Sequence, residues 1–180
     1  EQIKTLSFDD AVEIFKNRCL VGLGGSSFPT YVKLQYAKGK KIDMILINAI
    51  ECEPSISADY RLLDEKADDV LRGVLCLQNL FHCGDARICI KKKHGELIAK
   101  LQEKIAKDYP GSGISVDPMR NYYPQGWEIA MIKEATHGKV IIPPGKKGLP
   151  PDYGIFNVNA MTCAISPSTS KSALALRSPI

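Results

Sequence analysis

The sequence lacks the patterns that define several common classes of protein. No apolar run approaches the length of a membrane-spanning helix, and the N-terminal residues lack the basic-then-apolar order of a signal peptide. The phosphate-binding pattern G-x-x-x-x-G-K-S/T is absent, which disfavours a nucleoside triphosphatase of that type. The three histidines (His82, His94 and His137) lie at predicted helix ends, where we expect solvent-facing caps. No Ser-His-Asp arrangement can therefore be argued.

The six cysteines form no C-x-x-C pair, which argues against a zinc site and a disulfide framework. Several lie inside apolar runs, as do the free, mostly buried thiols of proteins in a reducing cytosol. They are Cys19, Cys52, Cys76, Cys83, Cys89 and Cys163. We therefore expect no metal ligands in this chain and a cytoplasmic location, with attachment to the inner face of the cell membrane as a further option.

The net charge of +4 is mild, and the lysines are scattered apart from one dense cluster, Lys91, Lys92, Lys93 and His94. This cluster lies between a predicted strand and a predicted helix. It is either a solvated strand end or a loop that contacts an anion. No aromatic residues are interleaved with it, which argues against nucleic-acid binding.

Short aliphatic segments alternate with amphipathic ones from residue 42 onward. The strands are predicted at 41–50, 86–90 and 113–119, and within 153–165, where a strand passes into a helix. The helices are predicted at 7–18, 31–37 with Thr30 as the cap, 64–81, 94–108 and 127–138. This alternation predicts a three-layer, Rossmann-like α/β domain with a mostly parallel sheet.

The segment "GLGGSS", residues 22–27, offers bare backbone N–H groups ahead of a predicted helix, as an anion site for a phosphate does. It follows the dinucleotide pattern G-x-G-x-x-G up to the last position, where Ser27 stands. The match alone leaves a plain flexible turn as an equal alternative. It also leaves open a generic dinucleotide-binding module, which Ser27 disfavours.

Polar residues follow the predicted strands, at the edge where open α/β sheets bind ligands. They include Asn48, Glu51 and Glu53 after the first strand, Tyr123, Gly126 and Glu128 after the third, and Asn159 and Thr162 after the last. Such amides, hydroxyls and carboxylates can hydrogen-bond a ring that has many heteroatoms. The pair Glu51 and Glu53 suits either acid–base chemistry or the binding of ribose hydroxyls, and the sequence does not decide between them.

Four blocks in order, "GLGGSSFPTYVKL", "NAIECEP…ADYRLL", "YPQGWE" and "GLPPDYG…NVNAMT", resemble the flavin-binding domain in the C subunit of the Rnf electron-transport complex. They are more distantly similar to the 51 kDa flavoprotein subunit of respiratory complex I. The segment "GLGGSSFPTY" looks closest to the corresponding segment of the proline-reductase-associated electron-transfer proteins of anaerobic bacteria. The resemblance covers Cys19 to Thr162.

The resemblance implies FMN as cofactor and NADH as substrate, with no side chain acting as a general base. The flavin-binding residues that it implies are Gly22, Gly24, Gly25, Lys33, Asn48, Glu51, Glu53, Tyr123, Gly126, Asn159 and Thr162. Phe28 and Glu128 would contact NADH. The chain would pass electrons between NADH, flavin and iron–sulfur centres located elsewhere, in another domain, a subunit, a reductase or a membrane complex. It would then be part of an NADH-dependent flavin oxidoreductase.

Three residues depart from the family pattern or stand out within it. Ser27 replaces a usual glycine, Ile50 stands where complex I has an aspartate, and the single tryptophan, Trp127, lies at the expected NADH face. Ser27 and Trp127 favour the alternative of a scaffold or docking domain that kept the fold and lost the cofactor. We expect residues 1–165 to form the FMN-binding domain and 166–180 to be a tail leading into a further domain.

Overall fold

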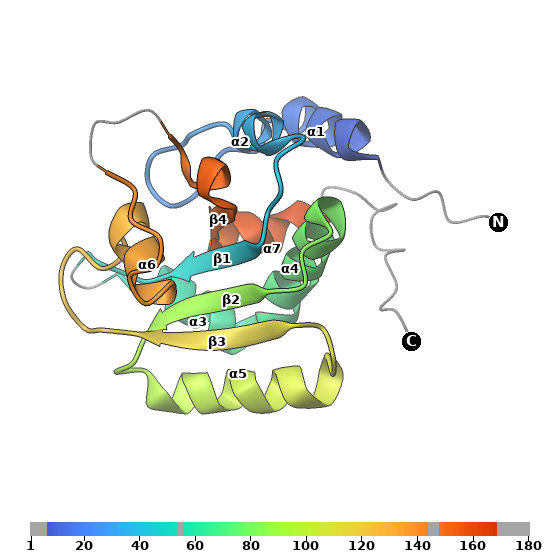
Figure 1. Cartoon of the computed structure of the whole chain (residues 1–180). Coiled ribbons are helices and arrows are strands. Elements are labelled where there is room, and N and C mark those ends of the chain that lie inside the picture. Colours follow the sequence, from blue (N-terminus) through green and yellow to red (C-terminus); the bar gives the residue numbers. More distant parts are fainter. Residues whose placement is uncertain (1–6, 54–55, 144–147, 169–180) are drawn as a thin grey trace.

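The computed structural model describes residues 7–53, 56–143 and 148–168, and it has the predicted alternation of strands and helices (Figure 1). The strands are β1 Met44–Ala49, β2 Ala86–Lys91, β3 Ile114–Met119 and β4 Ile155–Asn159. The helices are α1 Phe8–Asn17, α2 Thr30–Ala37, α3 Ala58–Glu65, α4 Ala67–Phe81, α5 Gly95–Asp108, α6 Glu128–Ala135, α7 Ala160–Ser168 and a 3₁₀ turn, η1 Pro150–Tyr153.

The four strands pair in the order β3-β2-β1-β4, and every pairing is parallel. The α/β class and the parallel sheet are therefore confirmed. After β1 the chain crosses to β2 and then to β3, and it returns to the other side of β1 only with β4. The carboxyl ends of β1 and β4 thus form the point of strand-order reversal, which is where open α/β sheets bind ligands.

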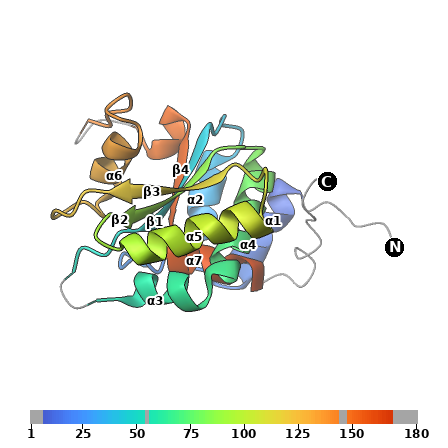
Figure 2. The same ribbon diagram turned by 90° about the horizontal axis from the view of Figure 1, so that it is seen from below.

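Alternate residues of each strand enter two separate cores, which makes the domain three-layered (Figure 2). Ile45 and Ile47 of β1 face the larger core with α3, α4, α5 and α7. Leu46 faces the smaller core, where Met131 and Ile132 of α6 pack. Aliphatic strands buried on both faces are the expected signature of a parallel sheet.

Two details of the helices differ from the sequence prediction. Thr30 is the first residue of α2 rather than its cap; Pro29 holds the cap position, and the Thr30 hydroxyl is buried without a hydrogen-bond partner among the described residues. A separate helix, α3, precedes α4, and it buries Leu63 against the larger core. Its eight residues are too few to show a clear periodic pattern in the sequence.

All six cysteines are free thiols. Cys83, Cys89 and Cys163 are buried, Cys52 and Cys76 are partly buried, and Cys19 is exposed. Burial raises the pKa of Cys89 and of Cys163, so both are inert packing residues at neutral pH. Among the described residues, no helix combines the length and the apolar character that a membrane crossing requires.

Helices α4 and α7 touch at Gly73, where a side chain would have no room. A Cβ atom at Gly73 would lie 2.1 Å from the carbonyl oxygen of Cys163. We expect Gly73→Ala to lower the free energy of unfolding by about 3 kcal/mol, because the helices must separate to admit the methyl group. Urea denaturation measures this loss.

The matched control is Gly95→Ala, at the first residue of α5, where a Cβ atom meets nothing within 4 Å. This variant should change the free energy of unfolding by less than about 1 kcal/mol, toward greater stability. Equal stability of the two variants would contradict the assigned packing of α4 on α7.

Candidate functional site

The glycine loop, residues 22–28, is held against the start of α7. Its two arms pair through Gly22 N–H to the Phe28 carbonyl at 2.7 Å and Thr30 N–H to the Leu20 carbonyl at 3.0 Å. At its tip, Leu23 N–H donates to the Thr162 hydroxyl at 2.8 Å. The exposed turn between these bonds therefore lies at the carboxyl end of β4.

The glycines of this loop are required for different reasons. A Cβ atom at Gly24 would lie 3.3 Å from Cβ of Asn159, so Gly24 allows the loop to pack on that side chain. Gly25 has φ +102°, and a Cβ atom there would enter open space beside the loop. Ser27 also has a positive φ, +50°, a conformation that glycine adopts at less cost. The family resemblance implied that Gly24 binds the flavin, and the sequence did not predict its contact with Asn159.

Asn159 joins four segments at the end of β4. Its Oδ1 accepts from Met161 N–H at 3.0 Å and from Thr162 N–H at 3.3 Å, which fixes the first turn of α7. Its Nδ2 donates to Asp59 Oδ2 at 3.0 Å and to the Asn48 carbonyl at 3.4 Å. Asn48 is also its strand partner in the β1–β4 register.

Asn48 extends this arrangement toward the loop before α6. Its Nδ2 donates to the Gly126 carbonyl at 2.9 Å, and its Oδ1 accepts from Ile50 N–H at 3.0 Å. A Cβ atom at Gly126 would lie 2.5 Å from the Ile50 carbonyl oxygen, so only glycine fits there. Gly126 N–H also donates to Cys52 Sγ at 2.8 Å. The β1–α3 and β3–α6 connections are thereby tied together.

Lys33 of α2 and Glu128 of α6 meet above Asn157 of β4. The Lys33 ammonium lies 3.4 Å from Glu128 Oε2, and Asn157 Nδ2 donates to the same oxygen. Burial lowers the pKa of Lys33, and Glu128 opposes part of that effect. Asn157 Oδ1 is buried and has no hydrogen-bond partner among the described residues. Lys33, Glu128 and Asn157 therefore provide one ion pair and, among the described residues, one hydrogen-bond acceptor without a partner.

Glu51 is linked to the same network through Asp59 of α3. Glu51 Oε1 accepts from Asp59 N–H at 2.8 Å, and the Asp59 side chain receives Asn159 Nδ2. Burial first, and then the nearby negative charge of Glu51, raise the pKa of Asp59 to about 6.

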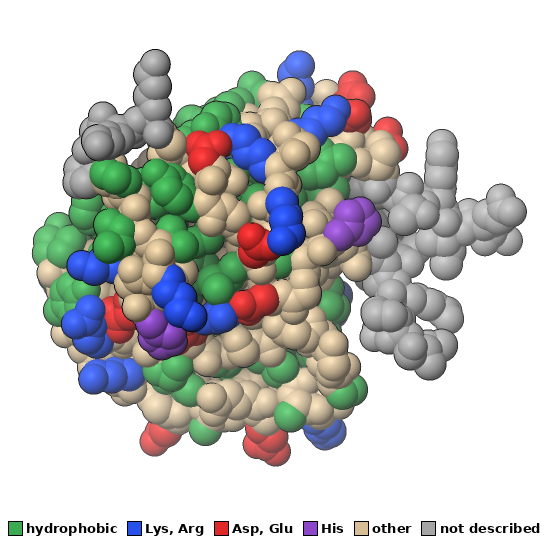
Figure 3. Space-filling model, in the orientation of Figure 1, with side chains coloured by type: hydrophobic (Ala, Val, Ile, Leu, Met, Phe, Trp, Pro, Cys, Tyr) green, Lys and Arg blue, Asp and Glu red, His purple; other side chains and the backbone are tan. Residues whose placement is uncertain are grey.

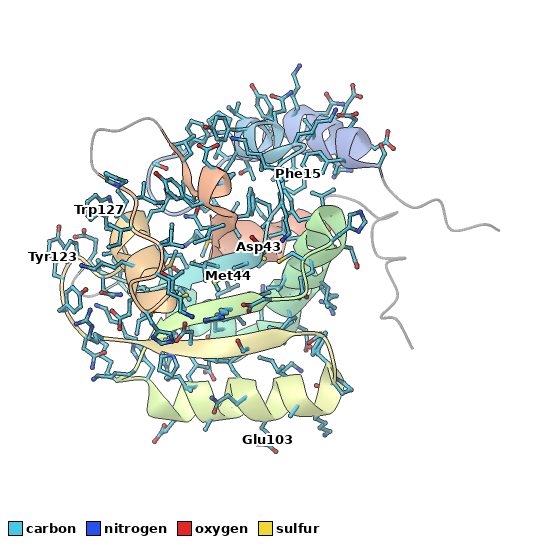
Figure 4. All side chains as sticks on the ribbon, viewed as in Figure 1. Phe15, Asp43, Met44, Glu103, Tyr123 and Trp127 are labelled. Atoms are coloured by element: carbon cyan, nitrogen blue, oxygen red, sulfur yellow. The ribbon has the colours of Figure 1, made fainter. Side chains whose placement is uncertain are left out.

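Most of the expected site residues converge on this edge of the sheet. The contacts above involve Gly22, Gly24, Lys33, Asn48, Glu51, Gly126, Glu128, Asn159 and Thr162. Gly25 lies in the exposed turn of the same loop. Three others lie at its rim: Phe28 and Tyr123 are 50% and 72% exposed, and Glu53 is exposed. Figure 4 shows Tyr123 and Trp127 at the outer edge of the molecule, beside α6.

The sequence places Asn157 with Asn159 and Thr162 among the polar residues after the last predicted strand, and Cys52 stands out because it lies between two glutamates. Neither was among the residues expected to bind FMN or NADH, and Asp59 carried no signal. Their contacts depend on distant residues: Asn157 meets Glu128, Cys52 meets Gly126, and Asp59 meets Asn159.

Comparison with known proteins assigns the chain to a known class of domain. The family model of the Nuo51 FMN-binding domain matches residues 15–166, so the chain belongs to that family. The chain is also 34% identical over 169 residues to the C subunit of the proton-translocating ferredoxin:NAD(+) oxidoreductase complex of Clostridium ljungdahlii, covering 93% of this chain and 35% of that protein.

A second relative is the C subunit of the Na(+)-translocating ferredoxin:NAD(+) oxidoreductase complex of Acetobacterium woodii. It is 32% identical over 162 residues, covering 90% of this chain and 35% of that protein. The chain thus spans about a third of the length of these curated relatives. A crystal structure of an NAD+-reducing NiFe-hydrogenase in the H2-reduced state has the same fold, with a TM-score of 0.77 at 21% identity, covering 91% of this chain and 31% of that one.

The raised pKa of Asp59 predicts a pH-dependent loss of stability. An aspartate with an ordinary pKa of 3.8 and a folded-state pKa of about 6 binds more protons when folded, so stability falls as the pH rises from about 4 to above 6. The fall attributable to Asp59 should be about 2 to 3 kcal/mol.

Asp59→Asn should remove that part of the pH dependence, because an amide oxygen still accepts from Asn159 but carries no charge. We expect the variant to be more stable than the native protein at pH 8 and similar to it at pH 4. Chemical denaturation at both pH values measures the difference. A native protein whose stability does not fall between these pH values would contradict the prediction.

Proposed function

We propose that this chain binds FMN at the carboxyl edge of β1 and β4 and acts as the flavin domain of an electron-transfer oxidoreductase. The observation that carries the proposal is the convergence of the glycine loop, Asn48 and Lys33 at the strand-order reversal. Membership of the Nuo51 FMN-binding domain family supports it independently.

The residues present fit a flat, anionic cofactor. Space beside Gly25 is open to a ligand, and the exposed turn offers backbone donors for a phosphate at the first turn of α7. Lys33 would supply a positive charge once it leaves Glu128. The unpaired Oδ1 of Asn157 is a buried acceptor that a donor group of a ring would satisfy.

FMN, when bound, would supply both hydride transfer and single-electron transfer in one group. The chain would bind and orient the reactants: Asn48 and Gly126 would line the cofactor, and Glu51, Glu53, Tyr123, Asn159 and Thr162 would surround it. Phe28, half exposed at the base of the glycine loop, would present an aromatic face to NADH, and Glu128 would also contact NADH. We also propose that electrons are exchanged with iron–sulfur centres in another domain or subunit.

Two of the relatives support this assignment. Both C subunits belong to ferredoxin:NAD(+) oxidoreductase complexes, in which a flavin domain can link a two-electron donor to one-electron centres. We further propose that the domain ends near residue 165, because the family match ends at residue 166. Helix α7 itself runs on to Ser168.

A cofactor-free scaffold is the second candidate. It is favoured by the pairing of Lys33 with Glu128 and by Trp127, which is 52% exposed beside the same site. A protein of this kind would stay colourless after incubation with FMN and would show no thermal shift. A flavin that binds but is not bleached by NADH would instead indicate electron transfer from another donor.

The glycine loop allows a matched test of FMN binding. Gly25 and Gly39 both have positive φ, +102° and +76°, and a Cβ atom at either would meet nothing within 4 Å. Alanine at either position should therefore cost a similar amount of stability, about 1 kcal/mol. Only Gly25→Ala places a methyl group in the proposed cofactor space, so only this variant should lose FMN affinity, by about tenfold or more.

Flavin absorbance after gel filtration and a fluorescence titration measure the affinity of each variant. The native protein and Gly39→Ala should retain flavin. Unchanged affinity in Gly25→Ala, or an equal loss in both variants, would exclude the loop as the binding element.

A further inference from the structure

A cleft of about 420 Å³ opens at the ends of β1 and β2, one strand away from the glycine loop. One wall comes from the segment after β1 and from α3, and the other comes from the turn between β2 and α5. The lining residues are Glu51, Cys52, Glu53, Ile56, Ser57, Tyr60, Lys91, Lys93 and His94. Its volume is within the range of small-molecule sites.

Two lysines face this cleft without a partner. Across the described part of the chain, neither the Lys91 nor the Lys93 ammonium group forms an ion pair or a side-chain hydrogen bond. The lysines on the neighbouring helix α5 are paired: Lys100 lies 2.5 Å from Asp64, and Lys104 lies 2.9 Å from Asp68. Lys91 and Lys93 are therefore available to an anion.

The cleft also has an uncharged aromatic wall. The rings of Tyr60 and His94 lie with centroids 4.8 Å apart and an interplanar angle of 50°. Burial, and then repulsion by Lys93 and Lys91, lower the pKa of His94, so its ring is neutral at neutral pH. Such a surface can stack a planar ring without adding charge.

Carboxylates complete the lining. Glu51 uses one oxygen to accept from Asp59 N–H, and the Glu53 side chain forms no hydrogen bond or ion pair with the described residues. Both would repel a simple anion, but both accept hydrogen bonds from hydroxyl groups. The cleft thus combines lysines that can bind an anion, carboxylates that can accept hydrogen bonds from hydroxyl groups, and an aromatic surface that can stack on a flat ring.

We propose that this cleft binds a nucleoside monophosphate unit. Its phosphate would contact Lys91 and Lys93, near the first N–H groups of α5, a 14-residue helix with no side-chain cap. The ribose hydroxyls would face Glu51 and Glu53, and the base would lie on the wall formed by Tyr60 and His94. This site uses no residue of the glycine loop. It shares Glu51 and Glu53 with the proposed flavin site, whereas Tyr60, Lys91, Lys93 and His94 belong to the cleft alone.

The same unit can come from a free nucleotide or from the adenylate half of NAD(H). Calorimetric titrations of the purified protein with AMP, adenosine, inorganic phosphate and NAD+ distinguish these sources. AMP should bind about tenfold or more tightly than either adenosine or phosphate, because each fragment lacks one set of contacts. If NAD+ binds as tightly as AMP and AMP displaces it, the dinucleotide is the source. If AMP binds and NAD+ does not, the source is a free nucleotide. Both outcomes support the site.

Lys92 provides the matched control, because it lies between Lys91 and Lys93 in the sequence but does not line the cleft. Lys93→Gln should weaken AMP binding by about tenfold, whereas Lys92→Gln should change it by less than about twofold. Both variants carry the same net charge, and equal thermal midpoints would show that both fold.

Three results would overturn the proposal. Phosphate that binds as tightly as AMP would reduce the cleft to a simple anion site. Equal losses in Lys92→Gln and Lys93→Gln would indicate attraction by general surface charge. The absence of AMP binding would leave the cleft without this function. The Gly25→Ala variant should still bind AMP, which separates this outcome from a failure of the flavin proposal.

Discussion

The side-chain amide of Asn159 is the interaction on which the functional edge of this domain depends. It lies where β4 becomes α7, and its acceptor oxygen fixes the first turn of that helix. Its donor nitrogen reaches Asp59 of α3 and the backbone of β1, while Gly24 packs against its Cβ atom. A half-buried amide whose donor and acceptor are both in use positions four segments, and the loss of a hydrogen-bond partner in one of them leaves a polar atom of Asn159 unsatisfied.

The order of the strands explains why this amide occupies a useful position. Because β4 returns beside β1 after two crossovers on the other side, the connections diverge and leave the strand ends accessible. Glycines at positions 24 and 126 then let the flanking loops approach, toward Asn159 in one case and toward Ile50 in the other. Figure 3 shows hydrophobic side chains gathered on the side of the molecule where α6 lies. The exposed Tyr123 and Trp127 lie at this outer rim (Figure 4).

The sequence predicted the fold well because buried parallel strands have a strong local signal: aliphatic runs such as that of β1 are short and bounded by polar turns. It also predicted the edge where the candidate residues meet, since topology alone brings Asn48 and Asn159 together as strand partners. Helix α3 was missed because eight residues with one buried leucine show little periodicity. The pairing of Lys33 with Glu128, 95 positions apart, depends on how α2 and α6 face each other, which no local pattern records.

The two proposed sites meet at Asp59. Its backbone N–H holds Glu51, which lines the cleft between β1 and β2, and its carboxylate receives Asn159, which supports the glycine loop. A negative charge placed on either side would further disfavour the ionised carboxylate and raise the pKa of Asp59 above its value of about 6. Uptake of a proton by Asp59 and binding of an anionic ligand would then favour each other, because linkage is reciprocal. The protonation of Asp59 would in this way link the two proposed sites, because the residue contacts a member of each.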